Sequence, residues 1–131
     1  MTLNDIAEAV IQKLRGKVII HRYDSYSTNS IYLKFDYGVA NSLRISDHTG
    51  KRYLKYRYNI LTDQKIKSVA KDHGFDRFYY SPKMINAVCR DILAAKRAKQ
   101  ERYKDYDAVV SRAMEKVQHE KGFWQDAKEI L

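Results

Sequence analysis

Apolar residues recur at helical spacing near the start of the chain. Four of them lie three or four positions apart: Leu3, Ile6, Val10 and Leu14. This spacing places the four side chains on one side of an α-helix. Thr2 or Asn4 can cap the start of the helix, and Gly16 follows its end. The pattern therefore predicts an amphipathic helix over residues 3–15.

From Lys17 to Ile60 the apolar period changes to two, the repeat of a β-strand. Four short segments show this repeat: residues 18–23, 31–37, 43–45 and 54–58. Turn-forming residues separate them, at 24–29, at Gly38 and at 47–50. We therefore expect an antiparallel sheet of three to four strands.

If the apolar side chains of this sheet face the helices, the alternating positions face the other way. These positions are Tyr32, Lys34, Asp36, Arg44, Tyr53, Lys55 and Arg57. One interpretation is a basic, aromatic binding face, on which tyrosines stack with nucleobases. The other is an ordinary solvated sheet face with cross-strand pairs of cations and tyrosines. The two interpretations explain the same residues equally well.

Two helical segments are predicted after the sheet. The first runs from Thr62 to His73 and ends before a glycine. The second begins at the Ser-Pro pair that contains Pro82, and neither glycine nor proline interrupts it before Gly122. Residues 82–119 are therefore expected to form one long helix, or two helices with a small break.

These patterns together predict an α+β protein: an N-terminal helix, the antiparallel sheet, a helix, and a long basic C-terminal helix. We place an α+β domain at residues 1–80 and a C-terminal helical element at 81–131, and a chain of 131 residues also suits a single compact unit. The aromatic patch of Phe75, Phe78, Tyr79 and Tyr80 is interpreted as core or as a lid over the sheet edge, with a partner pocket as the alternative.

Positive charge is concentrated in the middle of the chain. Residues 51–104 carry 15 Lys and Arg against 5 Asp and Glu, whereas the whole chain has a formal net charge of +9. A high net charge also keeps ordinary domains soluble, but dispersed charge would serve that purpose better. The clustering therefore favours a phosphate-rich partner.

Cations occur together with tyrosines in two clusters, and the two residue types are interleaved in the first. The first comprises Lys51, Arg52, Tyr53, Lys55 and Arg57, and the second Lys96, Arg97, Lys99, Arg102, Tyr103 and Lys104. Together with Lys34 and Arg44 of the outward sheet face, they are the candidate partner-binding or nucleic-acid-binding residues. The cations would contact phosphates, and Tyr53 and Tyr103 could stack. We expect that replacing Lys96, Arg97, Lys99 and Arg102 by glutamate abolishes activity and leaves the fold intact.

Catalytic and metal sites are not indicated. Cys89 is the single cysteine, and the four histidines are scattered, so no cofactor, metal or disulfide is expected. Asp47 and His48 are interpreted as turn residues rather than as catalytic groups. Asp47 with the acidic-x-Lys segment at 63–65 imitates a metal nuclease, but Asp63 begins a predicted helix. We therefore expect a protein that is not an enzyme.

Two nucleic-acid-binding folds remain as alternatives. A helix–turn–helix would use residues 62–73 and the following helix, although residues 75–81 are long for its tight turn. Double-stranded-RNA-binding domains share the outline of a helix, strands and a helix. Lys65, Lys67 and Lys71 do not form the cluster that such domains place at the start of their second helix.

Residues 30–38 and 42–48 resemble small proteins of phages and mobile elements. In particular, Leu43-Arg44-Ile45-Ser46-Asp47-His48 is similar to a strand end in some type II-A anti-CRISPR proteins, which inhibit Cas9. The resemblance implies non-catalytic binding to Cas9 or to its guide RNA, in the cytoplasm of a bacterial host. The positive charge excludes the DNA mimicry that several acidic inhibitors of this class use.

The alternative is a phage protein that binds DNA or RNA directly, or regulates transcription, without a defence target. A homodimer through the long C-terminal helix is a further candidate assembly. No membrane partner is expected, since no run of about 18 apolar residues occurs and the first residues lack the pattern of a signal peptide.

Overall fold

The predicted N-terminal helix is confirmed in the computed structural model, which describes residues 1–48, 56–62 and 78–131. This helix, α1 (Leu3–Leu14), begins with a capping box in which Thr2 and Asp5 each bond the other's backbone. Its buried side chains lie on one face and include Ile6, Val10 and Leu14. Local capping and apolar spacing therefore both specify this element.

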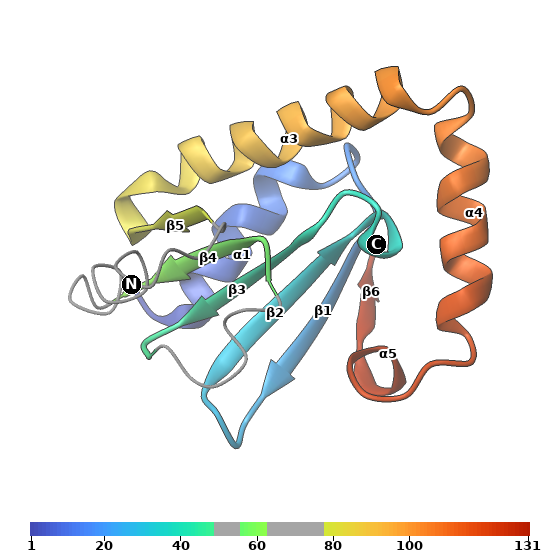
Figure 1. The fold of residues 1–131 in the computed structure, drawn as a ribbon. Helices are drawn as coiled ribbons and strands as arrows, with labels where there is room; N and C mark the ends of the chain where they lie inside the picture. The colour runs from blue at the N-terminus through green and yellow to red at the C-terminus, as the bar shows by residue number, and fades with distance from the viewer. Residues whose placement is uncertain (49–55, 63–77) are drawn as a thin grey trace.

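A six-stranded sheet forms the centre of the molecule (Figure 1). Its strands are β1 (Ile20–Ser25), β2 (Ser30–Phe35), β3 (Ser42–Ser46), β4 (Tyr58–Leu61), β5 (Phe78–Tyr80) and β6 (Lys128–Ile130). Their spatial order is β5-β4-β3-β2-β1-β6. The first three strands form an antiparallel meander, and β6 pairs antiparallel with β1.

The prediction of a purely antiparallel sheet of three to four strands is wrong. β4 pairs parallel with β3, and β5 pairs parallel with β4, so the sheet is mixed. β5 and β6 have three residues each, which is too short for an alternating pattern to identify them. The fourth strand also begins later than expected, at Tyr58 instead of near residue 54.

A single long basic C-terminal helix is not formed, and the structure has the other expected arrangement, two helices with a small break. The chain forms a short 3-10 turn, η3 (Pro82–Met84), and then two helices, α3 (Ile85–Arg102) and α4 (Tyr106–Val117). Tyr103 has an extended backbone, and the Asp105 carboxylate caps α4 by accepting a bond from the Ala108 amide at 3.1 Å. The predicted homodimer therefore lacks a continuous helix for its interface, and its contacts would have to come from α3 or from α4.

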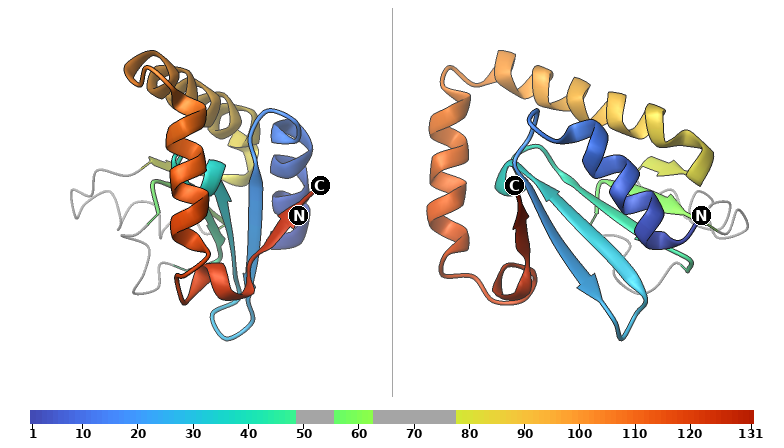
Figure 2. Two further views of the ribbon diagram at one scale, coloured as in Figure 1. Left: turned by 90° about the vertical axis from the view of Figure 1, so that its right-hand side faces the viewer. Right: turned by 180° about the vertical axis from the view of Figure 1, so that it is seen from behind.

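Helices α1 and α3 cover the same face of the sheet. The views in Figure 2 show α1 crossing this face and α3 running along its upper end. Val88, Cys89 and Ile92 of α3 join α1 and the inward residues of the strands in one buried cluster. Elements from both sides of the expected boundary at residue 80 thus share one core and one sheet.

The short segment before the last strand lies against the opposite, outer face of the sheet. The short helix α5 (Phe123–Asp126) places Phe123 at 5.9 Å from Tyr23 and Trp124 at 5.1 Å from His21, measured between ring centroids. The chain then returns as β6 along the edge of β1. The helix predicted over residues 62–73 lies outside the described residues.

Candidate nucleic-acid interface

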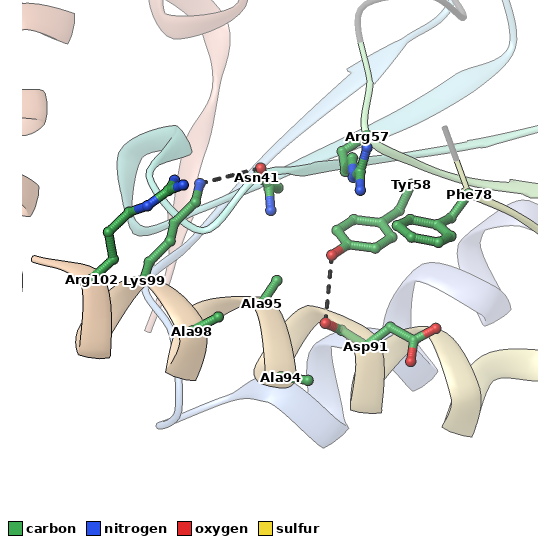
Figure 3. Close-up of a pocket in the computed structure, with 10 residues that line it drawn as sticks. All are labelled: Asn41, Arg57, Tyr58, Phe78, Asp91, Ala94, Ala95, Ala98, Lys99 and Arg102. Atoms are coloured by element: carbon green, nitrogen blue, oxygen red, sulfur yellow. Dashed lines mark hydrogen bonds between the residues drawn. The ribbon is translucent and has the colours of Figure 1, made fainter. Parts of the chain in front are cut away.

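A pocket of about 730 Å³ opens between α3 and the sheet, beside β4 and β5 (Figure 3). Three cations line it: Arg57, Lys99 and Arg102. We call it the basic pocket. Arg57 immediately precedes β4, whereas Lys99 and Arg102 lie in the last turn of α3. The fold thus brings together cations from both of the clusters predicted from the sequence.

Lys99 and Arg102 have no carboxylate partner in the described parts of the chain. The ammonium of Lys99 donates to the carbonyl of Val39 and, at 3.4 Å, to the side-chain oxygen of Asn41. Burial lowers the pKa of Lys99, and the positive charges of Arg102 and Arg57 lower it further. These cations therefore repel one another at a site that would favour an anion.

Aromatic rings form the other end of the basic pocket. Phe78 stacks on Tyr58 with 5.5 Å between ring centroids and 14° between ring planes. The guanidinium carbon of Arg57 lies 4.5 Å from the centroid of Phe78, within range of a cation–π contact. Phe78 is nevertheless 43% exposed, so part of its ring is accessible to a ligand.

One carboxylate, that of Asp91, lies in the basic pocket and is already engaged. Its Oδ2 accepts a hydrogen bond of 2.6 Å from the Tyr80 hydroxyl. Burial, together with this bond, raises the pKa of Tyr80. The carboxylate thus has a structural hydrogen bond, and the described lining residues include three cations and one acid.

Lys96 is placed differently from the cations of the basic pocket. Its ammonium lies 3.0 Å from Oδ2 of the buried Asp36 and donates to the Lys17 carbonyl at 2.7 Å. A glutamate at this position would face Asp36 in a buried setting. We therefore no longer expect the fourfold glutamate variant to keep its fold, and Lys96 is better left unchanged in tests of binding.

Three further residues of the second cluster are solvent-exposed: Arg97, Tyr103 and Lys104. None of them lines the basic pocket. They are accessible to a partner, but no described contact fixes them in a common site. Arg97 therefore offers a matched surface control on the same helix as Lys99 and Arg102.

Arg44 lies on the outward side of β3, as alternation predicts, but it is only 1% exposed. Its Nη2 donates to Ser46 at 3.0 Å, while Nε and Nη1 are buried and have no hydrogen-bond partner among the described residues. Strand alternation determines the side of a sheet, not the depth of the side chain. Arg44 therefore cannot reach the phosphates of a partner in this conformation.

Lys34 lies on the same outward face and contacts α5. Its ammonium is 4.7 Å from the ring centroids of both Phe123 and Trp124. These two contacts hold α5 against the sheet. The remaining predicted residues, Lys51, Arg52, Tyr53 and Lys55, lie outside the described residues.

Two other predicted orientations are wrong. Asp36 does not continue β2 on the outward face; it starts the 3-10 turn η1 (Asp36–Gly38) with φ 50° and is 2% exposed. Tyr56 was expected to point inward, but it stacks at 4.7 Å on Tyr32, an outward residue. Tyr56 and Arg57 precede β4, whereas Tyr58 and Ile60 within the strand face the core as predicted. The bend at Arg57 places this residue beside α3 in the lining of the basic pocket.

Ser46, Asp47 and His48 come close together but do not form a catalytic triad. The oxygens of Ser46 and Asp47 lie 3.1 and 2.8 Å from the same ring nitrogen, Nδ1 of His48. A triad needs the serine on one ring nitrogen and the carboxylate on the other. Among the described residues there is also no group of three or more His, Cys, Asp or Glu that could hold a metal. The segment at 63–65 lies outside them.

Sequence reasoning missed the neutral half of the basic pocket. Ala94, Ala95 and Ala98 line it from α3, and Asn41 lines it from the turn before β3. The spacing of the alanines puts them on one side of a helix, which is the available signal. For Phe78 the sequence indicated an aromatic patch, interpreted as core or lid with a partner pocket as the alternative.

No protein-family model, curated protein or solved structure was found to match the chain. In the described part of the chain, no helix combines the length and apolar character needed to cross a membrane. The hexapeptide that carries the anti-CRISPR resemblance is largely internal, since residues 43–46 are all buried. The functional argument therefore depends on the residues of the basic pocket.

Proposed function

We propose that this protein acts without catalysis, by binding a phosphate-bearing nucleic acid or ribonucleoprotein through the basic pocket. One observation carries the proposal: Lys99 and Arg102 project into a pocket shared with Arg57, and no carboxylate in the described chain neutralises them. Guanidinium and ammonium groups placed in this way bind phosphate oxygens through charge-assisted hydrogen bonds.

We further propose a type II-A Cas9–guide RNA complex as the target, which the protein would inhibit as an anti-CRISPR protein. The support is the resemblance at residues 43–48 and the match between a polyanionic guide RNA and the positive charge of the chain. Direct binding of RNA or DNA, without a defence target, is the alternative. The clustered charge supports both, because both partners present phosphates.

The test uses the double variant Lys99→Glu/Arg102→Glu and the control Arg97→Glu. Wild-type protein and both variants are titrated against labelled guide RNA and target DNA, and are added to target-DNA cleavage by the Cas9–guide complex. We expect the double variant to lose at least about 100-fold in affinity, because two charge-assisted contacts become repulsive. The control should lose much less, and its circular dichroism should match that of the wild type.

The binding and cleavage assays distinguish a Cas9–guide RNA complex from bare nucleic acid as the partner. Inhibition of cleavage that disappears in the double variant supports the Cas9 complex as target. Salt-sensitive binding of bare nucleic acid without inhibition supports the direct binder, with affinity falling by about 0.9 power of salt per phosphate contact. Equal behaviour of wild type and double variant in every assay would overturn the assignment to the basic pocket.

A further inference from the structure

The basic pocket has two chemically different ends. Figure 3 shows Lys99 and Arg102 at one end, and Tyr58 and Phe78 at the other, with Arg57 above the rings. A phosphate contact alone would require only the cationic end. Phe78 stacks on Tyr58, contacts the Arg57 guanidinium and is still 43% exposed, so it adds an accessible aromatic surface that a phosphate does not use.

Small side chains keep the space between these ends open. Ala94, Ala95 and Ala98 form the α3 side of the basic pocket, where a larger apolar residue on a helix of this kind would fill it. Its volume of about 730 Å³ lies within the range of pockets that enclose small organic ligands. Asn41 lines the middle and carries an amide that can both donate and accept hydrogen bonds.

We infer that the basic pocket takes one unpaired nucleotide, with its base against Phe78 and its phosphate at Lys99 and Arg102. This inference rests on the proposed function and deepens it. A nucleotide joins an anionic group to a planar aromatic one, in the order in which the two ends present cations and rings. In a duplex both faces of a base are covered by its neighbours, so only the cationic end could be used.

The inference predicts a preference for single strands that depends on Phe78 and on the open space. A labelled single-stranded RNA and the same sequence in a duplex are titrated with the wild type, Phe78→Leu and Ala98→Leu. Leucine at 78 keeps apolar volume without a π face, and leucine at 98 fills the pocket without changing charge. Gln100→Leu, at an exposed position of the same helix, is the control.

We expect both variants to lose about 5- to 100-fold in single-strand affinity, the range for one base–aromatic stack. Duplex affinity should stay within about twofold, and the control should bind both ligands as the wild type does. A nucleoside monophosphate should compete better than inorganic phosphate or the corresponding nucleoside, since only the nucleotide occupies both ends.

The outcomes separate this inference from the proposed function. The nucleotide-binding inference would be overturned if the wild type bound single strand and duplex equally and Phe78→Leu and Ala98→Leu left both affinities unchanged. If Lys99→Glu/Arg102→Glu then lost affinity for single strand and duplex alike, phosphate binding would still be supported. If the charge-reversed variant also binds normally, the proposed function fails as well. Melting curves of all variants identify any loss of affinity that comes from unfolding.

Discussion

The hydroxyl of Tyr106 donates a hydrogen bond of 2.6 Å to Oδ2 of Asp36, joining residues 70 positions apart. Asp36 also accepts the Ile19 amide at 2.7 Å and pairs with Lys96 at 3.0 Å. The carboxylate thus connects the start of β1, α3 and α4. This shared anchor holds the first residue of α4 against the turn that follows β2.

Tyr106→Phe should destabilise the protein without changing its binding of nucleic acid. The substitution keeps the ring and removes one hydrogen bond to a buried carboxylate, which typically costs about 1–3 kcal/mol. The free energy of unfolding from urea titration measures this loss. Tyr103→Phe, at an exposed position, should change it by less than about 0.5 kcal/mol. Equal stability of both variants would show that the Asp36 anchor does not hold α4.

Arg44→Met should leave affinity for nucleic acid unchanged. Arg44 is buried, and two of its nitrogens have no hydrogen-bond partner in the part of the chain that the structure describes. Replacing a buried charge by an apolar side chain of similar length is often neutral or stabilising. Urea titration and RNA binding test the two statements separately. A loss of RNA affinity with normal stability would return Arg44 to the set of contact residues.

The sequence allowed α1 to be predicted because its signals are local: apolar spacing and a capping box at Thr2. It did not reveal that β4 runs parallel to β3, because that pairing depends on how the chain returns between them. In the site, Arg57, Lys99 and Arg102 were predicted as binding residues. The sequence did not indicate that the three side chains line the same pocket. Whether a cation enters a pocket or, like Lys96, anchors the fold depends on neighbours that are distant in sequence.

Stability should depend on His21 in weakly acidic solution. Burial lowers the pKa of His21 from 6.5, and Glu129, 3.6 Å from its Nε2, only partly opposes this effect. The unfolded chain therefore binds a proton at a pH where the folded chain does not, so the free energy of unfolding decreases as the pH falls below about 6.5. The decrease ends once the pH is below the pKa of His21 in the folded protein.

Urea titrations across this pH range test the prediction. His21→Phe keeps a ring between Tyr37 and Trp124 and removes the titrating group, so its stability should vary less with pH. His119→Gln, at an exposed histidine, should behave as the wild type. The same slope in all three proteins would mean that other groups cause the dependence.

Binding should weaken in alkaline solution through Lys99. Its pKa lies below 10.5, first because of burial and then because of Arg102 and Arg57. A bound phosphate favours the charged ammonium, so affinity is complete below the pKa of free Lys99 and declines as the pH rises through it. Lys99→Arg keeps its charge throughout this range and should abolish the decline. A DNA oligonucleotide serves as ligand, since RNA hydrolyses in alkali.

The pairing of β6 with β1 has a consequence for how this protein is made. Ile20 pairs with Ile130, so the edge of β1 stays open during synthesis until residue 130 has left the ribosome. An open strand edge offers free amide and carbonyl groups to any neighbouring chain. Nascent chains on crowded polysomes should therefore be most prone to aggregate after β1 has emerged and before residues 128–130 have followed it.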